Sequence, residues 1–220
     1  MNFTVRPAIR FGWETFKRRP WFFIGATLVI VIAYGVVGGI SNGIDAAVGA
    51  SAEGPSLIGG LVNLVLSTFV GMGVTAFFLA AHDNPETVDL SALWHPRSFW
   101  KFLVASILVG FAIGIGLVLL IVPGILAMLF FMFSTVIVVD RDLGPIEAMK
   151  ESMRIGRGYR WSLLGLVALL ALIVFVGMLA FFVGLLVAMP VATLAFIHAY
   201  RVLSGHDGQT AVPVDARLAA

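Results

Sequence analysis

The sequence predicts an all-α membrane protein with six transmembrane helices in three hairpins, each preceded by an amphipathic helix at the membrane surface. Three observations carry this prediction. Of the 220 residues, 60% are hydrophobic and only 12% are charged, which is about half the charged share of an ordinary soluble domain. Four long stretches carry no charge at all, and the basic residues gather between them. Such a chain is suited to lipid rather than to water.

The charge-free stretches set the number of spans. A bilayer core about 30 Å thick takes about 20 helical residues. Stretches of 25 and 29 residues therefore suit single crossings, whereas those of 38 and 40 residues are long enough for two. Within a single transmembrane domain over 1–204, the predicted spans are 21–41, 57–81, 99–121, 124–139, 161–180 and 183–203.

Proline and glycine mark the predicted helix breaks. Pro123 and Gly124, within "LLIVPGILAM", predict a turn in the third stretch, because proline ends one helix and readily begins the next. In the fourth stretch we expect the turn between Gly177 and Gly184. Pro190 is expected to kink the last span.

Two segments before the spans read as amphipathic surface helices. Residues 4–18 and 144–159 each combine an apolar stripe with charges on the other face. Residues 89–94 are a shorter candidate. The chain would then consist of three repeats, each a surface helix followed by a transmembrane hairpin. The alternative is that every cytoplasmic loop carries aromatic and basic residues as membrane anchors, which would give a similar sequence pattern. The predicted stripes are Val5, Ile9, Trp13 and Phe16 in the first helix, and Ile146, Met149 and Met153 in the second.

The basic residues predict the orientation. All 14 fall on one side of the six-span topology, whereas the other side carries only Asp45 and Glu53. Because positively charged loops stay in the cytoplasm, we expect both termini there, in a bacterial inner membrane. A topology with five spans would instead place Arg201 and Arg217 outside the cytoplasm.

A cleaved signal peptide is the alternative interpretation of the N-terminal apolar segment, but this segment exceeds the usual 7–15 apolar residues of a signal peptide. Residues 205–220 read as a mobile polar tail.

Composition and motifs argue against enzymes and nucleic-acid binding. The chain has no cysteine, and its net charge is only +2, so we expect no cysteine-held metal, no cofactor and no nucleic acid. His82, Asp83 and Glu86 lack the spacing of a metalloprotease helix and read as a solvated turn. An enzyme would require His82, Asp83 or His95 to converge with another acidic residue such as Glu14. We therefore predict a non-catalytic protein.

Candidate binding residues are of two kinds. Asn63, with Ser67 one turn below, is the best candidate for a polar site inside the membrane, although such groups more often bond a helix backbone. Small residues one turn apart, such as Gly35 and Gly39, favour close helix packing or self-association. The candidate contacts to lipid headgroups are Arg10, Lys17, Arg18, Arg19, Lys150, Arg154, Arg157 and Arg160.

One stretch supports a resemblance to a known family. Residues 117–161 contain a Pro-Gly turn, an aromatic helix, an aspartate and a G-P-x-x-A-x-x-x-S segment. This pattern resembles a family of six-span bacterial membrane proteins. That family includes the YciC-like inner-membrane proteins and the membrane domain fused to some glycerophosphodiester phosphodiesterases. The resemblance covers most of residues 8–205. It implies a six-span fold and supplies no catalytic residue, and without a phosphodiesterase domain in this sequence it does not imply that activity. The matching residues are Pro123, Gly124, Asp140, Gly144, Pro145, Ala148 and Ser152.

These patterns favour a structural, envelope-maintenance or lipid-interacting role, in which the basic helices engage anionic headgroups or a partner. The expected partners are membrane lipids, another membrane protein or a second copy of the chain. The alternative is a transporter or lipid-handling protein with a cavity between hairpins near Pro123 and Pro190. A cavity would favour the alternative, whereas a solid core of small residues would favour a scaffold.

Overall fold

The computed structural model describes residues 5–48, 56–93, 98–180 and 183–205. Within these ranges the chain is helical and contains no strand, and six helices are long and apolar enough to cross a membrane. The all-α fold class is thus confirmed. Predictions that concern Glu53, His95, Arg217, the connection at 181–182 and the tail after Gly205 lie outside the described residues.

The elements follow the predicted order. The fourth candidate span, Ile121–Arg141, consists of two consecutive helices rather than one. The elements are α1 (Val5–Arg18), α2 (Pro20–Ala47), α3 (Leu57–Asp83), the short 3-10 helix η1 (Leu90–Leu93), α4 (Phe99–Leu119), α5 (Ile121–Phe131), α6 (Ser134–Arg141), α7 (Pro145–Ile155), α8 (Arg160–Leu179) and α9 (Leu185–Leu203).

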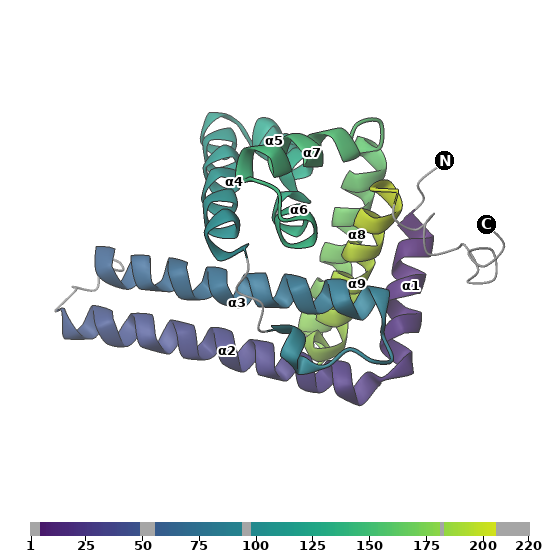
Figure 1. Ribbon diagram of the computed structural model, residues 1–220, viewed down its shortest axis with the longest axis horizontal. Coiled ribbons are helices and arrows are strands. Elements are labelled where there is room, and N and C mark those ends of the chain that lie inside the picture. Colours follow the sequence, from purple (N-terminus) through teal and green to yellow (C-terminus); the bar gives the residue numbers. More distant parts are fainter. Residues whose placement is uncertain (1–4, 49–55, 94–97, 181–182, 206–220) are drawn as a thin grey trace, which may run out of the picture.

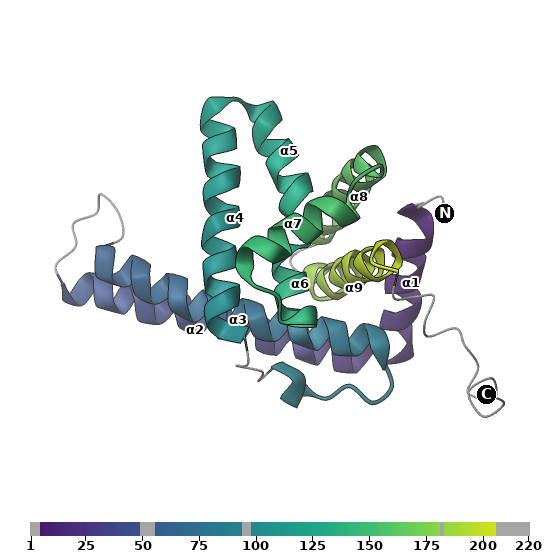
Figure 2. The same ribbon diagram turned by 45° about the horizontal axis from the view of Figure 1, so that its top comes forward.

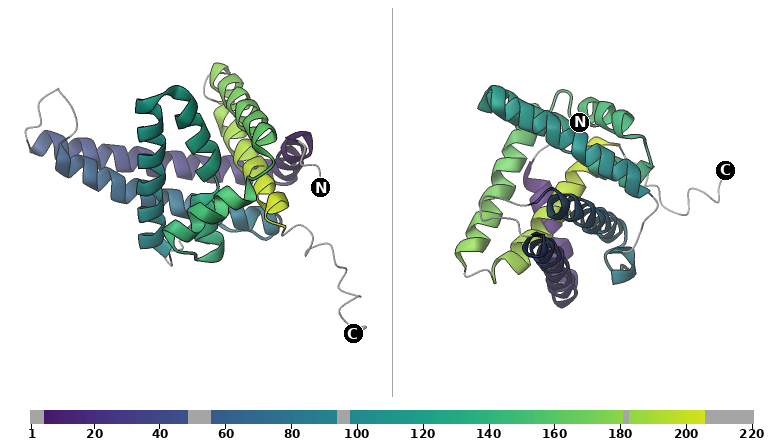
Figure 3. Two further views of the ribbon diagram at one scale, coloured as in Figure 1. Left: turned by 90° about the horizontal axis from the view of Figure 1, so that it is seen from above. Right: turned by 90° about the vertical axis from the view of Figure 1, so that its left-hand side faces the viewer.

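The three hairpins extend in different directions from a shared base. The α2–α3 hairpin lies across the other two in Figure 1 and is seen end-on in the right panel of Figure 3. Figure 2 shows α4 rising from beside α3 and α5 returning next to it. The helices α8 and α9 form the third hairpin, and α1 packs along α9. The free ends of the hairpins therefore lie apart while their bases meet.

The best-packed core lies at this shared base. Aromatic rings join the hairpins there: Phe23 of α2 contacts Phe77 of α3, with ring centroids 6.5 Å apart. Phe133, just before α6, lies 5.8 Å from the ring of Tyr200 in α9. All four rings are fully buried. The hairpins are thus held together mainly at one end.

The turn between α4 and α5 lies at Leu120, just before the predicted Pro123-Gly124 break. Leu120 is extended, with φ −168° and ψ 152°. Pro123 instead lies in the first turn of α5, where its missing N–H would have no intrahelical partner anyway. Gly124 lies against Gly116 so closely that a Cβ on Gly116 would be 2.8 Å from the Gly124 Cα. Gly116 and Gly124 therefore allow the close antiparallel packing of α4 against α5. The helix α9 continues through Pro190.

The surface helices form close to the predicted bounds, but the faces they bury match the predicted stripes only in part. In α1 the buried residues include Ala8 and Gly12, whereas Trp13 of the predicted stripe is 45% exposed. The reason is backbone contact: a Cβ on Gly12 would lie 2.5 Å from the Val191 carbonyl oxygen of α9. Likewise α7 buries Ala148, Ser152 and Ile155 and leaves the predicted Ile146 exposed. Small residues therefore make the closest contacts, and of the predicted stripe in α1 Phe16 is buried whereas Trp13 is not.

Candidate functional site

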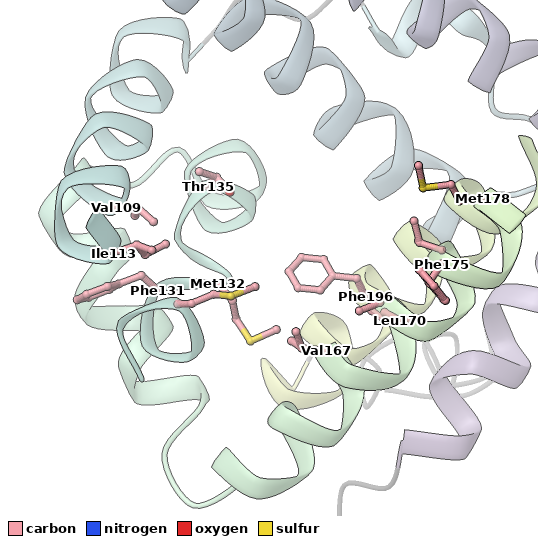
Figure 4. Close-up of a pocket in the computed structure, with 13 residues that line it drawn as sticks. Val109, Ile113, Phe131, Met132, Thr135, Val167, Leu170, Phe175, Met178 and Phe196 are labelled. Atoms are coloured by element: carbon pink, nitrogen blue, oxygen red, sulfur yellow. The ribbon is translucent and has the colours of Figure 1, made fainter. Parts of the chain in front are cut away.

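An apolar cavity of about 700 Å³ separates the second hairpin from the third. Figure 4 shows Val109 and Ile113 of α4 on one side and Val167 and Leu170 of α8 on the other, with Phe196 of α9 between the two walls. The volume falls within the range of about 300–1,000 Å³ that is usual for small-molecule sites. The predicted cavity near Pro123 and Pro190 thus has a counterpart between hairpins, but neither proline lines it.

The lining of this cavity is chemically uniform. It contains Met128, Met132 and Met178 besides aliphatic and aromatic residues, and its hydroxyl comes from Thr135. No charged side chain is among the described residues that line it. Methionine is unbranched and flexible, so it adapts to guests of variable shape. The cavity therefore suits an apolar chain rather than an ion or a polar solute.

The wall of the cavity is shaped by the unpredicted break between α5 and α6. Ser152 of α7 fastens this break: its hydroxyl donates to the Phe130 carbonyl oxygen at 2.8 Å and accepts from the Phe133 N–H at 3.2 Å. These are backbone groups that a helix end leaves without a partner. The break lets Met132 and Thr135 both face the cavity. The serine of the G-P-x-x-A-x-x-x-S segment thus has a defined structural task.

A buried arginine joins the three hairpins below the cavity. Arg201 of α9 has a side chain only 9% exposed; it donates a hydrogen bond to Asp83 of α3 at 2.6 Å and forms an ion pair with Asp140 of α6 at 2.9 Å. The Tyr200 hydroxyl donates to the second oxygen of Asp140 at 2.6 Å. We call these four residues the Arg201 cluster. Asp83, Asp140 and Arg201 therefore lie at the ends of span helices and pair with one another.

A histidine pair extends the Arg201 cluster toward α1. Nε2 of His82 lies 3.1 Å from Nδ1 of His198, and the ring of Phe11 stacks on His198 with centroids 4.2 Å apart. The side chain of His82 is only 9% exposed. The prediction of a solvated turn is therefore wrong for His82, because the turn packs against α1 and α9. Among the described residues, no group of three His, Asp or Glu side chains could hold a metal ion.

A second, polar cavity of about 450 Å³ lies beside the Arg201 cluster, and Ser98 and Asp142 contribute to its wall. Asp142 ends α6 in the left-handed conformation, with φ 50°. Its carboxylate accepts a hydrogen bond from Ser98 at 2.5 Å and pairs with Lys101 at 2.9 Å. The acidic groups of this cavity are thus already partnered within the protein. Glu14, the other acidic residue considered for an enzyme, pairs instead with Arg10 on the exposed face of α1.

Most of the predicted headgroup contacts engage the protein itself. Arg10 pairs with Glu14 at 2.6 Å. Arg154 holds Glu151 through two hydrogen bonds of 2.5 and 2.7 Å, a bidentate geometry. The hydrogen bond from Arg154 keeps the pKa of Glu151 below its ordinary value, although partial burial opposes this. Arg141 also pairs with Glu151, at 2.8 Å.

Two further predicted contacts tie the junction of α1 and α2 to the segment after α3. Arg18 lies 3.5 Å from the Glu86 carboxylate. Arg19 donates to the backbone carbonyl oxygens of Glu86 at 2.9 Å and Val88 at 3.3 Å. These bonds hold the start of the first hairpin against the connection that follows it.

The remaining basic residues lie at the surface. Lys17 is 5.7 Å from the ring centroid of Trp13, and Arg160 is 4.5 Å from that of Phe130. Such cation–π contacts at exposed sites contribute about 0.5–1 kcal/mol. Lysine and arginine in these positions keep their charges accessible. The last two of the eight candidates, both exposed, are Lys150 and Arg157.

The candidate polar pair in α3 lies away from both cavities. Asn63 and Ser67 are half-buried, and neither lines the apolar or the polar cavity. The Ser67 hydroxyl donates to the Leu64 carbonyl oxygen of its own helix at 3.3 Å. This backbone bond is the usual role of a serine in a membrane helix.

Six apolar helices around this base define a multi-pass, α-helical membrane protein. The chain is similar to uncharacterized protein Rv2560 of Mycobacterium tuberculosis, with 26% identity over 228 residues that cover 93% of this chain and 70% of the relative. It matches uncharacterized protein Mb2590 of Mycobacterium bovis to the same extent. No family model matches the chain, and no solved structure matches it significantly. The relatives therefore carry no activity over to this protein.

Proposed function

We propose that this chain is a non-catalytic lipid-handling protein of a bacterial inner membrane, which accommodates an apolar lipid chain between its second and third hairpins. The observation that carries the proposal is the uncharged cavity of about 700 Å³ between those hairpins. A purely structural scaffold would instead be expected to fill this space with small side chains. The lipid-handling alternative is therefore favoured over a scaffold role.

The location of the cavity supports a lipid guest. Its walls are α4, α5, α6, α8 and α9, all parts of candidate membrane spans, so a guest could enter directly from the bilayer. Lipid tails are as apolar as the lining, so water exclusion gives little driving force for binding. Retention then rests on van der Waals contacts, which are individually weak. Such a site binds reversibly and exchanges with the bilayer, as a lipid-handling protein requires.

The proposal includes an orientation. With both termini cytoplasmic, the exposed basic residues Lys17, Lys150 and Arg157 would lie at the inner leaflet. Each basic residue near an anionic surface contributes about 1 kcal/mol. These residues would draw anionic headgroups toward the base of the hairpins. Membership of the YciC-like group belongs to the same proposal, and the fastening of the α5–α6 break by Ser152 of the shared segment supports it.

The test is lipid retention by cavity-filling variants. Ala171 and Ala168, one turn apart on α8, are both exposed, but only Ala171 lines the cavity. We expect protein purified from bacterial membranes in mild detergent to keep lipid, detected by native mass spectrometry. The variant Ala171→Phe should lose most of it, while Ala168→Phe should retain it. Wild-type protein without lipid, or equal retention by both folded variants, would contradict the proposal.

A further inference from the structure

We propose that the bridge from Asp140 of α6 to Tyr200 and Arg201 of α9, which is part of the Arg201 cluster, is a latch between the two walls of the apolar cavity, and that its release admits or discharges the guest. This inference rests on the proposed lipid-handling function and concerns its control. Three features of the described residues support it. The cavity wall formed by α8 is loosely packed, and polar contacts between α6 and α9 lie at the inner end of the cavity. Arg201 and Asp140 also each have a second charged partner that remains when these contacts break.

The loosely packed wall is α8. Its buried residues are Leu163, Leu166 and Gly177, near the two ends of the helix. Between these points one face of α8 lines the large cavity, and another face lines an apolar cavity of about 390 Å³ beneath α1. Contacts between α8 and the facing helix α5 are few. Because α8 packs mainly against α9, its middle is held by the third hairpin and only weakly by the second.

The polar bridge crosses from the second hairpin to the third. Asp140 of α6 accepts a hydrogen bond from Tyr200 of α9 at 2.6 Å and forms an ion pair with Arg201 of α9 at 2.9 Å. Phe196, which lines the cavity, lies one helical turn before Tyr200 on α9. On α6, Thr135 of the cavity wall lies just over one turn before Asp140. The bridge thus lies at the inner end of the cavity and fixes the separation of its walls there.

Each charge of the bridge has a second partner. If Asp140 moves away, Arg201 still pairs with Asp83 of α3 at 2.6 Å. Asp140 in turn lies 3.9 Å from the guanidinium of its neighbour Arg141. Burial of an unpaired charge is what makes breaking most buried ion pairs costly. Because neither charge would be left alone, the open arrangement is accessible.

Matched variants separate the latch from general stabilisation. Asp140→Asn and Tyr200→Phe weaken the bridge between α6 and α9. Asp83→Asn is the control, because it weakens a bond of the same arginine that points to α3 and not across the cavity. Tyr200→Phe removes a single hydroxyl, so it is expected to fold even if Asp140→Asn does not, and thermal melting would establish which variants are folded.

The chain contains no cysteine, so paired spin labels can be introduced without background. One pair, at exposed positions Leu117 of α4 and Leu179 of α8, spans the cavity. The reference pair, Phe111 and Ile125, lies within the second hairpin. In lipid nanodiscs the latch predicts a longer and broader distance between α4 and α8 in the bridge variants. It predicts no change in Asp83→Asn or in the reference pair.

Exchange of a fluorescent phospholipid provides the functional readout. We expect exchange about tenfold faster in the folded bridge variants than in wild type, which corresponds to about 1.4 kcal/mol. An unchanged α4–α8 distance in folded Tyr200→Phe would overturn the latch, as would an equal change in Asp83→Asn. Absence of retained lipid in wild type would instead overturn the proposed function, so the two failures are distinguishable.

Discussion

The two helices of the third hairpin, α8 and α9, are neighbours in sequence but differ sharply in their surroundings. Within the most apolar 18-residue stretch of each helix, 17% of the residues of α8 are buried, compared with 56% of those of α9. Yet α9 is the less apolar of the two, and it carries His198, Tyr200 and Arg201. Lipid is as apolar as leucine, so hydrophobicity alone does not draw a membrane helix into the protein. Small and polar residues do so, because they allow close contact and specific bonds.

The largest expected effect that tests this contrast is at the contact between α1 and α9. The variant Gly12→Val would place side-chain atoms against the Val191 carbonyl oxygen, since even a Cβ there would lie 2.5 Å from it. We expect a loss of stability of about 3 kcal/mol from overpacking, measured by thermal or SDS-induced unfolding in detergent. Gly35→Val in α2, where nothing lies within 4 Å, is the control and should be nearly neutral. Equal losses at both sites would contradict the assigned α1–α9 contact.

A smaller effect compares the two helices directly. Leu194 of α9 is fully buried, whereas Leu172 of α8 is 53% exposed. The variant Leu194→Ala should cost about 2 kcal/mol, near the low end for buried leucines, because mainly packing is lost when lipid is the alternative surrounding. Leu172→Ala should stay within about 0.5 kcal/mol. A cost for Leu172→Ala equal to that of Leu194→Ala, in the same unfolding assay, would show that α8 is as firmly packed as α9.

The smallest effect concerns α7, which leads into α8. Glu151→Gln weakens the bonds to Arg154 and Arg141 and should cost about 1 kcal/mol at neutral pH. Hydrogen bonding from Arg154 lowers the pKa of Glu151, so the carboxylate stabilises the fold above its ordinary pKa of 4.5. That contribution is lost as the pH falls below this value. The difference in melting temperature between wild type and variant should therefore shrink under acid. A constant difference from pH 7 to pH 3 would argue against this ion pair.

The sequence predicted much of the fold because the length of an uncharged stretch and the basic residues beside it can be read from each segment of the chain on its own. The bounds of α3 and α4 and the position of Pro145 at the start of α7 follow from local rules. The buried face of each surface helix and the break between α5 and α6 depended instead on contacts with other helices. Phe16 of the predicted stripe is buried, but Trp13 is exposed because glycine, which hydrophobic periodicity ignores, allows the closest contact at Gly12. The break after Phe131 needs Ser152, which lies in another helix.

The Arg201 cluster was missed for a similar reason. Asp83, Asp140 and Arg201 each border a charge-free stretch, where a charge normally faces water or headgroups. Their convergence depends on how three hairpins meet, which no single segment encodes. One signal was present in the sequence: Asp140 belonged to the motif from Pro123 to Ser152, although no role could be assigned to it from the sequence. The structure gives that carboxylate two partners, Tyr200 by a hydrogen bond and Arg201 by an ion pair.

The position of Arg201 in the last helix also has a consequence for how the chain is made. Asp83 leaves the ribosome 118 residues before the arginine that neutralises it. At about 5–20 residues per second, this delay is about 6–24 s. During that interval the second hairpin is also made, and both hairpins remain without the cation that joins them until α9 is synthesised. Assembly of the three hairpins is therefore timed by the synthesis of α9.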